Sequence, residues 1–355
     1  MNERATYKKF ITLTPLTPFF FGSELTFSAD DTRDKEKARF FAESYKLPQQ
    51  TTLLGMIRKE ILRAKGKLRI HKNGEWVDLP KRRGGGDSEE YKAVVALTGC
   101  KAFDIFDGSS SELGIIDRLS EVFLVKDGKI YRKMPADYQL NPKKLDNIAI
   151  NLGRYKKEFL IDFGIDIKKY DIDFFMHKEE VVPANEKANE EENGIFKRIE
   201  TVGIKKLSED EGFFQKISYT LKNRFSFGFF LELKEDVEFK GVVQLGGEGS
   251  LFLIKACSAF EDFQFEPKSG FDRVILLSDT LLQEDAIGYC DFILGESRVI
   301  RVLKRQYKKT KKGIRIKVLS AGSVIYTSEF DKLKGFLDNL HLQKIGMNIY
   351  TRSVG

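Results

Sequence analysis

Several short stretches of the chain alternate apolar and polar residues with the period of two that a half-buried β-strand requires. The first covers residues 10–18, where prolines close the strand. Residues 212–221, 225–233 and 238–247 follow the same pattern and are separated by turns, so they predict an antiparallel meander. A further strand is predicted at residues 271–277, after a Lys-Ser-Gly turn.

One stretch has the spacing of a helix instead. Residues 53–62 carry apolar side chains at intervals of three and four, and they follow the sequence Pro-Gln-Gln-Thr-Thr. Thr51 or Thr52 is the predicted N-cap, because a threonine hydroxyl can accept a hydrogen bond from a free amide of the first turn.

Turn-forming residues divide the rest of the chain. Asp127 and Gly128 stand between two strand-like runs and predict a β-hairpin over residues 121–131. The basic and then glycine-rich residues 66–90 are interpreted as a mobile loop, and the acidic, Asn-rich residues 177–194 as an exposed excursion.

These elements indicate an α+β protein of two domains. A length of 355 residues is enough for two hydrophobic cores, and 30 Phe placed largely in strand-like runs argue against an all-helical fold. The new strand after residue 265 suggests that the second domain begins there. Two α+β sandwiches of the ferredoxin-like type would suit this order of elements, although periodicity alone does not fix the topology.

The composition says more about the cellular location of the protein than about its function. The net charge is +7, but 32% of the residues are charged, so only the distribution of charge is informative. The cysteines Cys100, Cys257 and Cys290 are widely spaced, which argues against a disulfide framework or a zinc site. The polar N-terminus resembles neither a signal peptide nor a membrane span, so we expect a soluble cytoplasmic protein with no membrane partner.

A glycine-rich turn is the first candidate for binding. Gly246, Gly247 and Gly249 lie within four residues, so the backbone can adopt positive φ angles and present its amides to a phosphate group. Spacing alone favours a plain turn at the end of a strand. No Lys-Ser or Lys-Thr pair follows as in a P-loop, which argues against nucleotide hydrolysis.

The second candidate is a basic hairpin. Residues 298–317 contain ten Lys and Arg residues and no acidic residue, and their alternation predicts two strands joined by a basic turn at 308–312. We expect Arg301, Lys304 and Arg305 to contact the phosphates of a nucleic acid, or of a protein coated with it. Tyr307 could stack on a base.

Other features favour structure over chemistry. Residues 224–230 faintly resemble the aromatic strand of an RRM sheet, but neighbouring Phe side chains point to opposite faces, so core packing is the better interpretation.

The histidines His71, His177 and His341 are scattered, and no pair has metal-ligand spacing. His71, beside Lys72, is the least implausible base for metal-free RNA cleavage. We therefore predict no catalytic residue, no metal and no cofactor.

Three motifs resemble the RAMP proteins of CRISPR systems. Residues 47–58, Leu-Pro-Gln-Gln-Thr-Thr-Leu-Leu-Gly-Met-Ile-Arg, look like the family's opening helix, and residues 246–249 are similar to its glycine-rich loop. Residues 321–326, Ala-Gly-Ser-Val-Ile-Tyr, are similar to a segment typical of the third subunit of type III-B Cmr complexes. Together the motifs resemble this Cas-five-like family over nearly the whole chain.

The resemblance implies two ferredoxin-like (RRM-like) domains with long insertions, residues 1–264 and 265–355, and a projecting β-hairpin thumb near residues 195–221. It implies a non-catalytic subunit at the foot of an RNA-guided complex for antiviral defence. There the subunit would bind the 5′ tag of the CRISPR RNA (crRNA), between the large Cas-ten-type subunit and the first backbone RAMP subunit of the Cmr complex. The alternatives are a RAMP-class CRISPR-repeat endoribonuclease that uses His71, and a scaffold that binds only protein.

The resemblance also implies which residues lie at the RNA. These are Thr51, Thr52 and Arg58 in the opening helix, Gly203, Ile204, Lys205 and Lys206 in the thumb, and Gly246, Gly247, Glu248 and Gly249 in the turn. Ser250 stands where the family often has a basic residue, so a charge contact is in doubt at that position.

Overall fold

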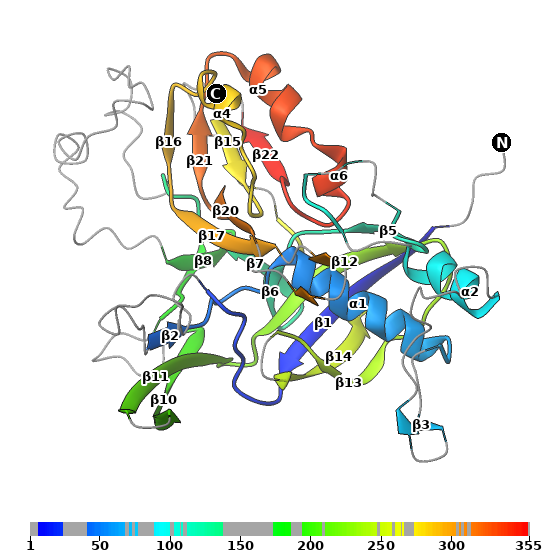
Figure 1. The fold of residues 1–355 in the computed structure, drawn as a ribbon. Coiled ribbons are helices and arrows are strands. Elements are labelled where there is room, and N and C mark those ends of the chain that lie inside the picture. The colour runs from blue at the N-terminus through cyan, green and yellow to red at the C-terminus, as the bar shows by residue number, and fades with distance from the viewer. Residues whose placement is uncertain are drawn as a thin grey trace.

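The computed structural model describes the chain in segments. These are residues 6–23, 41–67, 71–72, 75–76, 89–99, 103–106, 108, 112–137, 173–185, 194–207, 210–246, 249–257, 260–263, 265, 273–302, 305–306, 309–310 and 314–353. Most sheets are antiparallel and helices are few, so the predicted α+β class is confirmed (Figure 1). None of the helices in these segments is long and apolar enough to cross a lipid bilayer.

The largest sheet is built around the first strand. In the described part of the chain it has nine strands, in the order β13 (Lys240–Gln244), β14 (Leu251–Cys257), β1 (Tyr7–Pro15), β12 (Ser226–Leu233), β6 (Phe123–Lys126), β7 (Lys129–Lys133), β8 (Phe174–His177) and β9 (Glu180–Pro183), while β5 (Ile116–Leu119) also pairs with β12. The predicted opening strand therefore forms, three residues earlier than expected.

Helix α1 (Gln50–Ala64) covers one face of this sheet (Figure 1). Its buried side chains share a core with Ile11 and Leu13 of β1. The predicted N-cap is wrong, because Gln49 takes the cap position with extended backbone, and Thr51 and Thr52 lie in the first turn. Gln50 is buried, so tertiary packing starts the helix before the threonines.

The predicted meander is wrong in its pairing, although all three strands form. β11 (Asp210–Leu221) pairs with β10 (Phe196–Leu207) and with the short β2 (Phe41–Glu43), outside the large sheet. β12 and β13 are not neighbours, because β1 and β14 lie between them. Phe227 and Phe229 of β12 are fully buried, which confirms the core-packing interpretation of this aromatic stretch.

The hairpin predicted at Asp127 and Gly128 is confirmed. These residues have φ angles of 49° and 78° and join β6 to β7, as a two-residue turn with positive φ requires. The predicted excursion at 177–194 begins as a hairpin of β8 and β9, in which His177 is buried against expectation, whereas residues 178–181 are exposed as predicted. Apolar side chains on β8, such as Phe175, bring this stretch into the core despite the acidic residues that follow.

Only parts of the predicted loop at residues 66–90 belong to the described residues. Among them, β3 (His71–Lys72) pairs with β4 (Glu75–Trp76), and α2 begins at Glu89 and ends at Thr98. Residues 68–70, 73–74 and 77–88 lie outside the described segments.

A smaller sheet follows in the last third of the chain. Its elements succeed one another as β15 (Arg273–Leu276), α4 (Glu284–Ile287), β16 (Phe292–Leu294), β21 (Val324–Tyr326), α5 (Phe330–Leu337), α6 (Leu340–Gln343) and β22 (Tyr350–Ser353). The strands lie in the order β16-β21-β15-β22, all antiparallel. This sheet has its own core, which includes Val274 and Leu333. The domain boundary near residue 265 stays a prediction.

The predicted basic hairpin is an insertion between β16 and β21. It consists of β17 (Ser297–Val302) and β20 (Ile314–Leu319), continued by the two-residue strands β18 (Arg305–Gln306) and β19 (Lys309–Thr310). Ile300 and Ile316 are buried in the core that α1 and β1 also form. The hairpin is therefore fixed at its root by the large sheet's core.

Gly322, within the segment 321–326 that resembles the Cmr family, joins the two sheets. Its carbonyl accepts a hydrogen bond from the Ala136 amide at 2.9 Å, just beyond the end of β7. Its φ angle is +85°, and an added Cβ would lie 2.8 Å from the Met134 carbonyl oxygen. Both the backbone angle and the lack of space require glycine here.

Gly322→Ala should therefore destabilise the protein more than Gly128→Ala does. Both glycines have positive φ, but a Cβ at Gly128 would meet nothing within 4 Å. We expect the left-handed angle to cost about 1–3 kcal/mol at either position, and the overlap at Gly322 to add about 1–3 kcal/mol. Urea unfolding at constant m-value measures both. Equal losses in the two variants would contradict the close contact.

Candidate nucleic-acid interface

The glycine-rich turn connects β13 to β14. Gly246 and Gly249 have φ angles of +86° and +72°, and the Leu245 amide donates to the Ser250 carbonyl at 3.0 Å to close the turn. A Cβ on Gly246 would lie 2.8 Å from the carbonyl oxygen of Phe20. Gly247 and Glu248 lie outside the described residues. The turn thus has the left-handed backbone that its sequence predicts.

Ser250 anchors this turn to the segment that follows β1. Its side chain is buried, and its Oγ accepts a hydrogen bond from the Phe20 amide at 3.2 Å. Leu16 N–H donates to the Leu251 carbonyl at 2.9 Å, and Leu251 N–H donates to Thr17 Oγ1 at 3.0 Å. Ser250 therefore holds the turn in place and does not present a charge to a ligand.

Helix α1 meets the turn from another side. Lys59 Nζ donates to Gln244 Oε1 at 3.2 Å, and Arg63 donates to the carbonyls of Val242 at 3.2 Å and Lys240 at 2.9 Å. Lys59 and Arg63 are exposed and one turn apart, so they form a basic stripe on the helix.

Sequence reasoning missed the Lys59 and Arg63 stripe. Their i, i+4 spacing on the polar side of the predicted helix was the available signal. The residues that were named in the helix, Thr51, Thr52 and Arg58, are half-buried.

The region in which the resemblance implies a thumb forms a hairpin of β10 and β11, hereafter the thumb hairpin. Each strand has 12 residues, and pairing continues to Leu207 opposite Asp210. At about 3.3 Å per residue the strands extend roughly 40 Å. Successive side chains at Thr201 and Val202 are both exposed, so both faces of the hairpin are open to solvent there.

The predicted thumb residues lie toward the tip of this hairpin. Gly203 pairs with Phe214, Lys205 with Gly212 and Lys206 with Glu211, and Ile204 stands between them on β10. Nothing is described of the side chains from 204 to 214.

The base of the thumb hairpin contacts the same segment as the glycine turn. Phe19 N–H donates to the Tyr219 carbonyl at 2.7 Å, and Tyr219 N–H donates back to the Phe19 carbonyl at 3.1 Å. In Figure 1 the segment after β1 lies between the thumb hairpin and the ends of β13 and β14. The turn, the thumb base and α1 are therefore joined by contacts into one surface. We call it the glycine-turn surface, made of Phe20, Lys59, Arg63, Lys216, Gly246 and Gly249.

The basic hairpin forms a second cationic region. Arg301 lies directly opposite Arg315 across β17 and β20, and Arg315 and Lys317 are exposed. Like charges in directly opposed positions destabilise a sheet. Arg305 lies in β18, where its side chain is not described, and Lys304 lies outside the described residues. No described contact joins this hairpin to the glycine turn.

The root of the basic hairpin touches the chain just ahead of α1. Tyr45 Oη donates to the Val299 carbonyl at 2.9 Å, and the Arg298 guanidinium lies 4.8 Å from the centre of the Tyr45 ring. The Arg298 side chain also forms an ion pair with Asp279. Of the basic residues in this stretch, Arg298 therefore has a structural role.

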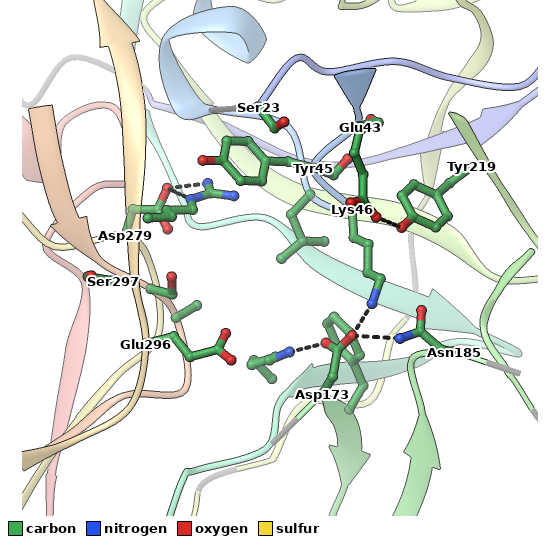
Figure 2. A pocket seen from close by; sticks show the side chains of 17 residues that line it. Ser23, Glu43, Tyr45, Lys46, Asp173, Asn185, Tyr219, Asp279, Glu296 and Ser297 are labelled. Atoms are coloured by element: carbon green, nitrogen blue, oxygen red, sulfur yellow. Dashed lines mark hydrogen bonds and ion pairs between the residues drawn. The ribbon is translucent and has the colours of Figure 1, made fainter. Parts of the chain in front are cut away.

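A pocket of about 660 Å³ lies between the thumb base and the root of the basic hairpin (Figure 2). In it the ammonium groups of Lys46 and Lys133 both contact Asp173, and Tyr219 Oη donates to Glu43 at 2.6 Å. Burial alone would raise the pKa of Asp173, but the two ammonium groups overcome it and hold that pKa below its usual value. Because Lys46, Lys133 and Arg298 all have carboxylate partners, the pocket is poorly suited to phosphate.

The histidines have structural surroundings where they are described. His177 is buried with Nδ1 at 2.8 Å from the Ile130 carbonyl. His341 lies 2.6 Å from the Asp104 carbonyl and stacks on Phe103. The side chain of His71 lies outside the described residues. Within the described segments, no group of three or more His, Cys, Asp or Glu residues could hold a metal ion.

Asp173→Asn should lower the free energy of unfolding by about 1–3 kcal/mol, because two partly buried ammonium groups lose their carboxylate. The folded-state pKa is lowered, so this stabilisation is complete above the unfolded-state pKa of about 3.9 and is lost as pH falls through the folded-state value. Denaturant unfolding from pH 7 to pH 3 should show the difference from wild type shrinking below about pH 4. The exposed Asp117→Asn serves as the control, and a pH-independent difference would contradict the pairing.

No protein-family model matches this sequence, and no curated protein matches it. Among solved structures, the chain is similar to a subunit in the cryo-EM structure of the type III-B Cmr-beta complex bound to cognate target RNA. The two share 14% identity over 97% of this chain and 96% of that one, with a TM-score of 0.49. It is also similar to a chain of the Csm3-Csm4 subcomplex of the type III-A CRISPR-Cas interference complex, at 13% identity over 90% and 93% of the two chains and a TM-score of 0.34.

With TM-scores below 0.5, these similarities transfer neither a fold nor a role to this chain. The similar chains belong to type III CRISPR complexes, the class of complex whose proteins the sequence motifs resemble, and the matches cover nearly the whole of this chain.

Proposed function

We propose that this chain is a non-catalytic, RNA-binding subunit of a type III-B CRISPR effector complex. In this role it holds the 5′ tag of crRNA and bridges the large Cas-ten-type subunit to the first backbone subunit. The observation that carries the proposal is the glycine turn, held by Ser250 and Phe20 between the thumb base and the basic stripe of α1.

This arrangement suits the sugar-phosphate backbone of RNA. At Gly249, which has positive φ, an added Cβ would meet nothing closer than the Gln244 amide nitrogen at 3.7 Å, so a phosphate has room to approach the main chain there. At Gly246 the corresponding space is filled by the Phe20 carbonyl. Lys59 adds positive charge beside the turn, whereas Arg63 is paired with Glu60 at 2.6 Å and holds α1 against the start of β13. Backbone contacts of this kind fix the register of an RNA and carry no base identity, so they would position the tag without reading its bases.

The topology supports the finer fold that the resemblance implies. The smaller sheet has the element order β-α-β-β-α-β with its first strand flanked by the third and the last, which is the ferredoxin-like arrangement. In the larger sheet, β1 is likewise flanked by β12 and β14, with α1 between β1 and β5. We propose two ferredoxin-like domains, the first with β13 and the glycine turn in place of a second helix.

Binding of a tag-containing RNA to the purified chain should weaken steeply as salt rises. Each phosphate contact contributes about 0.7 to the slope of log K against log salt for a single strand. The variant Lys59→Gln should reduce both the affinity for RNA and this slope. The double variant with Arg301 and Arg315 both replaced by Gln should do the same. Lys92→Gln, at an exposed site on α2 paired with Glu89, should change neither. Absence of RNA binding, alone and with neighbouring subunits, would contradict the proposal.

The same preparation separates the two alternatives. A repeat endoribonuclease would cut repeat RNA without metal, and His71→Ala would abolish specific cleavage. Intact RNA with wild type and variant alike is the expected result. A scaffold that binds only protein would give no RNA crosslink at the thumb hairpin or the basic hairpin within the assembled complex.

A further inference from the structure

Three consecutive phenylalanines follow β1, and the middle one points away from the core. Phe19 and Phe21 are buried and stack on each other with ring centres 4.6 Å apart. Phe20 is half-buried. Because its neighbours are anchored in the core, the direction of Phe20 is fixed by packing on both sides.

The backbone of Phe20 is also held on both sides. Its amide donates to Ser250 Oγ at 3.2 Å, and its carbonyl oxygen lies where a Cβ on Gly246 would come within 2.8 Å. The next residue toward the N-terminus, Phe19, is paired with Tyr219 of the thumb hairpin. An aromatic ring is therefore preorganised between the glycine turn and the thumb base, with little flexibility left to lose on binding.

A lysine lies against the ring of Phe20. The Lys216 ammonium lies 5.5 Å from the ring centre, over its face. Among the described residues, Phe20 has no ring contact with another aromatic side chain, in contrast to Phe19 and Phe21. A half-buried ring that packs against a lysine and not against the core gives the core little stabilisation. It does offer a π-face in a basic setting, which is the combination that single-stranded nucleic acids bind.

We propose that Phe20 is a stacking platform for one base of the bound RNA, beside the phosphate held at the glycine turn. The inference rests on the proposed function and names a contact within it. Because the Lys216 ammonium lies over one face of the ring, the base would stack on the opposite face. Because every base has a π-face, the platform recognises an unpaired nucleotide and tolerates its identity.

The test combines protein variants with modified RNA. A single-stranded RNA carrying the tag is bound to the full chain at several salt concentrations, with wild type, Phe20→Leu and Phe20→Trp. Leucine keeps apolar bulk without a π-face, so Phe20→Leu should weaken binding by about 10-fold with an unchanged salt slope. Phe20→Trp should bind as wild type does. Leu16→Ala, at an exposed apolar site on the same segment, is the matched control and should have no effect.

RNAs with one abasic site each identify the partner base. One site should weaken binding to wild type by about 10-fold and leave binding to Phe20→Leu unchanged, because the stacked pair is already lost. If wild type binds no RNA, the proposed function and the inference both fail. If wild type binds with a steep salt dependence but Phe20→Leu binds equally well, or no abasic site discriminates the two proteins, only the platform is overturned.

Discussion

The pairing of β1 on both of its edges is the constraint on which the remaining structure depends. Ile11 and Leu13 are fully buried under α1, while the backbone between them bonds to β12 on one side and β14 on the other. This pairing decides where the chain can go next. The segment leaving β1 must pass the end of β14, and there it meets both the glycine turn and the base of the thumb hairpin.

The chain uses its positive charges in two different ways. One group is partly buried and ion-paired, and it consists of Lys46, Lys133 and Arg298. Each of these side chains contacts a carboxylate, and the ion pairs connect separate segments of the chain around one pocket. Arg315 and Lys317 are exposed on the strand of a hairpin whose facing residues do not neutralise them. The distinction matters because a net charge of +7 is modest, and only the second group adds to the field that an anionic partner would meet.

Local sequence patterns predicted the turns and strands whose conformation depends on residues close together in the chain. Asp127 and Gly128 specified their hairpin because a two-residue turn needs positive φ at both positions, and alternation located β17 and β20. Alternation does not say which strands pair, so the meander was wrong where β1 and β14 come between β12 and β13. The threonine cap failed for a related reason, since burial of Gln50 is decided by tertiary contacts.

The candidate site also has parts that the sequence predicted and parts that it did not. Its glycines and the thumb strands were visible as motifs, whereas the role of Arg63 depends on two carbonyls of β13 about 180 residues away, and that of Phe20 on Ser250. The pocket was not predictable because Lys46 and Asp173 are separated by 127 residues. Contacts across such distances leave no periodic signal in one sequence.

The position of β14 also determines when this protein can fold. Thr12 and Lys255 are 243 residues apart in the chain, yet they face each other across β1 and β14. A ribosome must therefore synthesise more than two thirds of the chain before the central strand acquires its second neighbour. Until then one edge of β1 is open to other strands, and contacts of such high sequence separation form slowly. Formation of the large sheet is thus tied to synthesis of β14, and a product truncated before it would expose a strand edge that β14 covers.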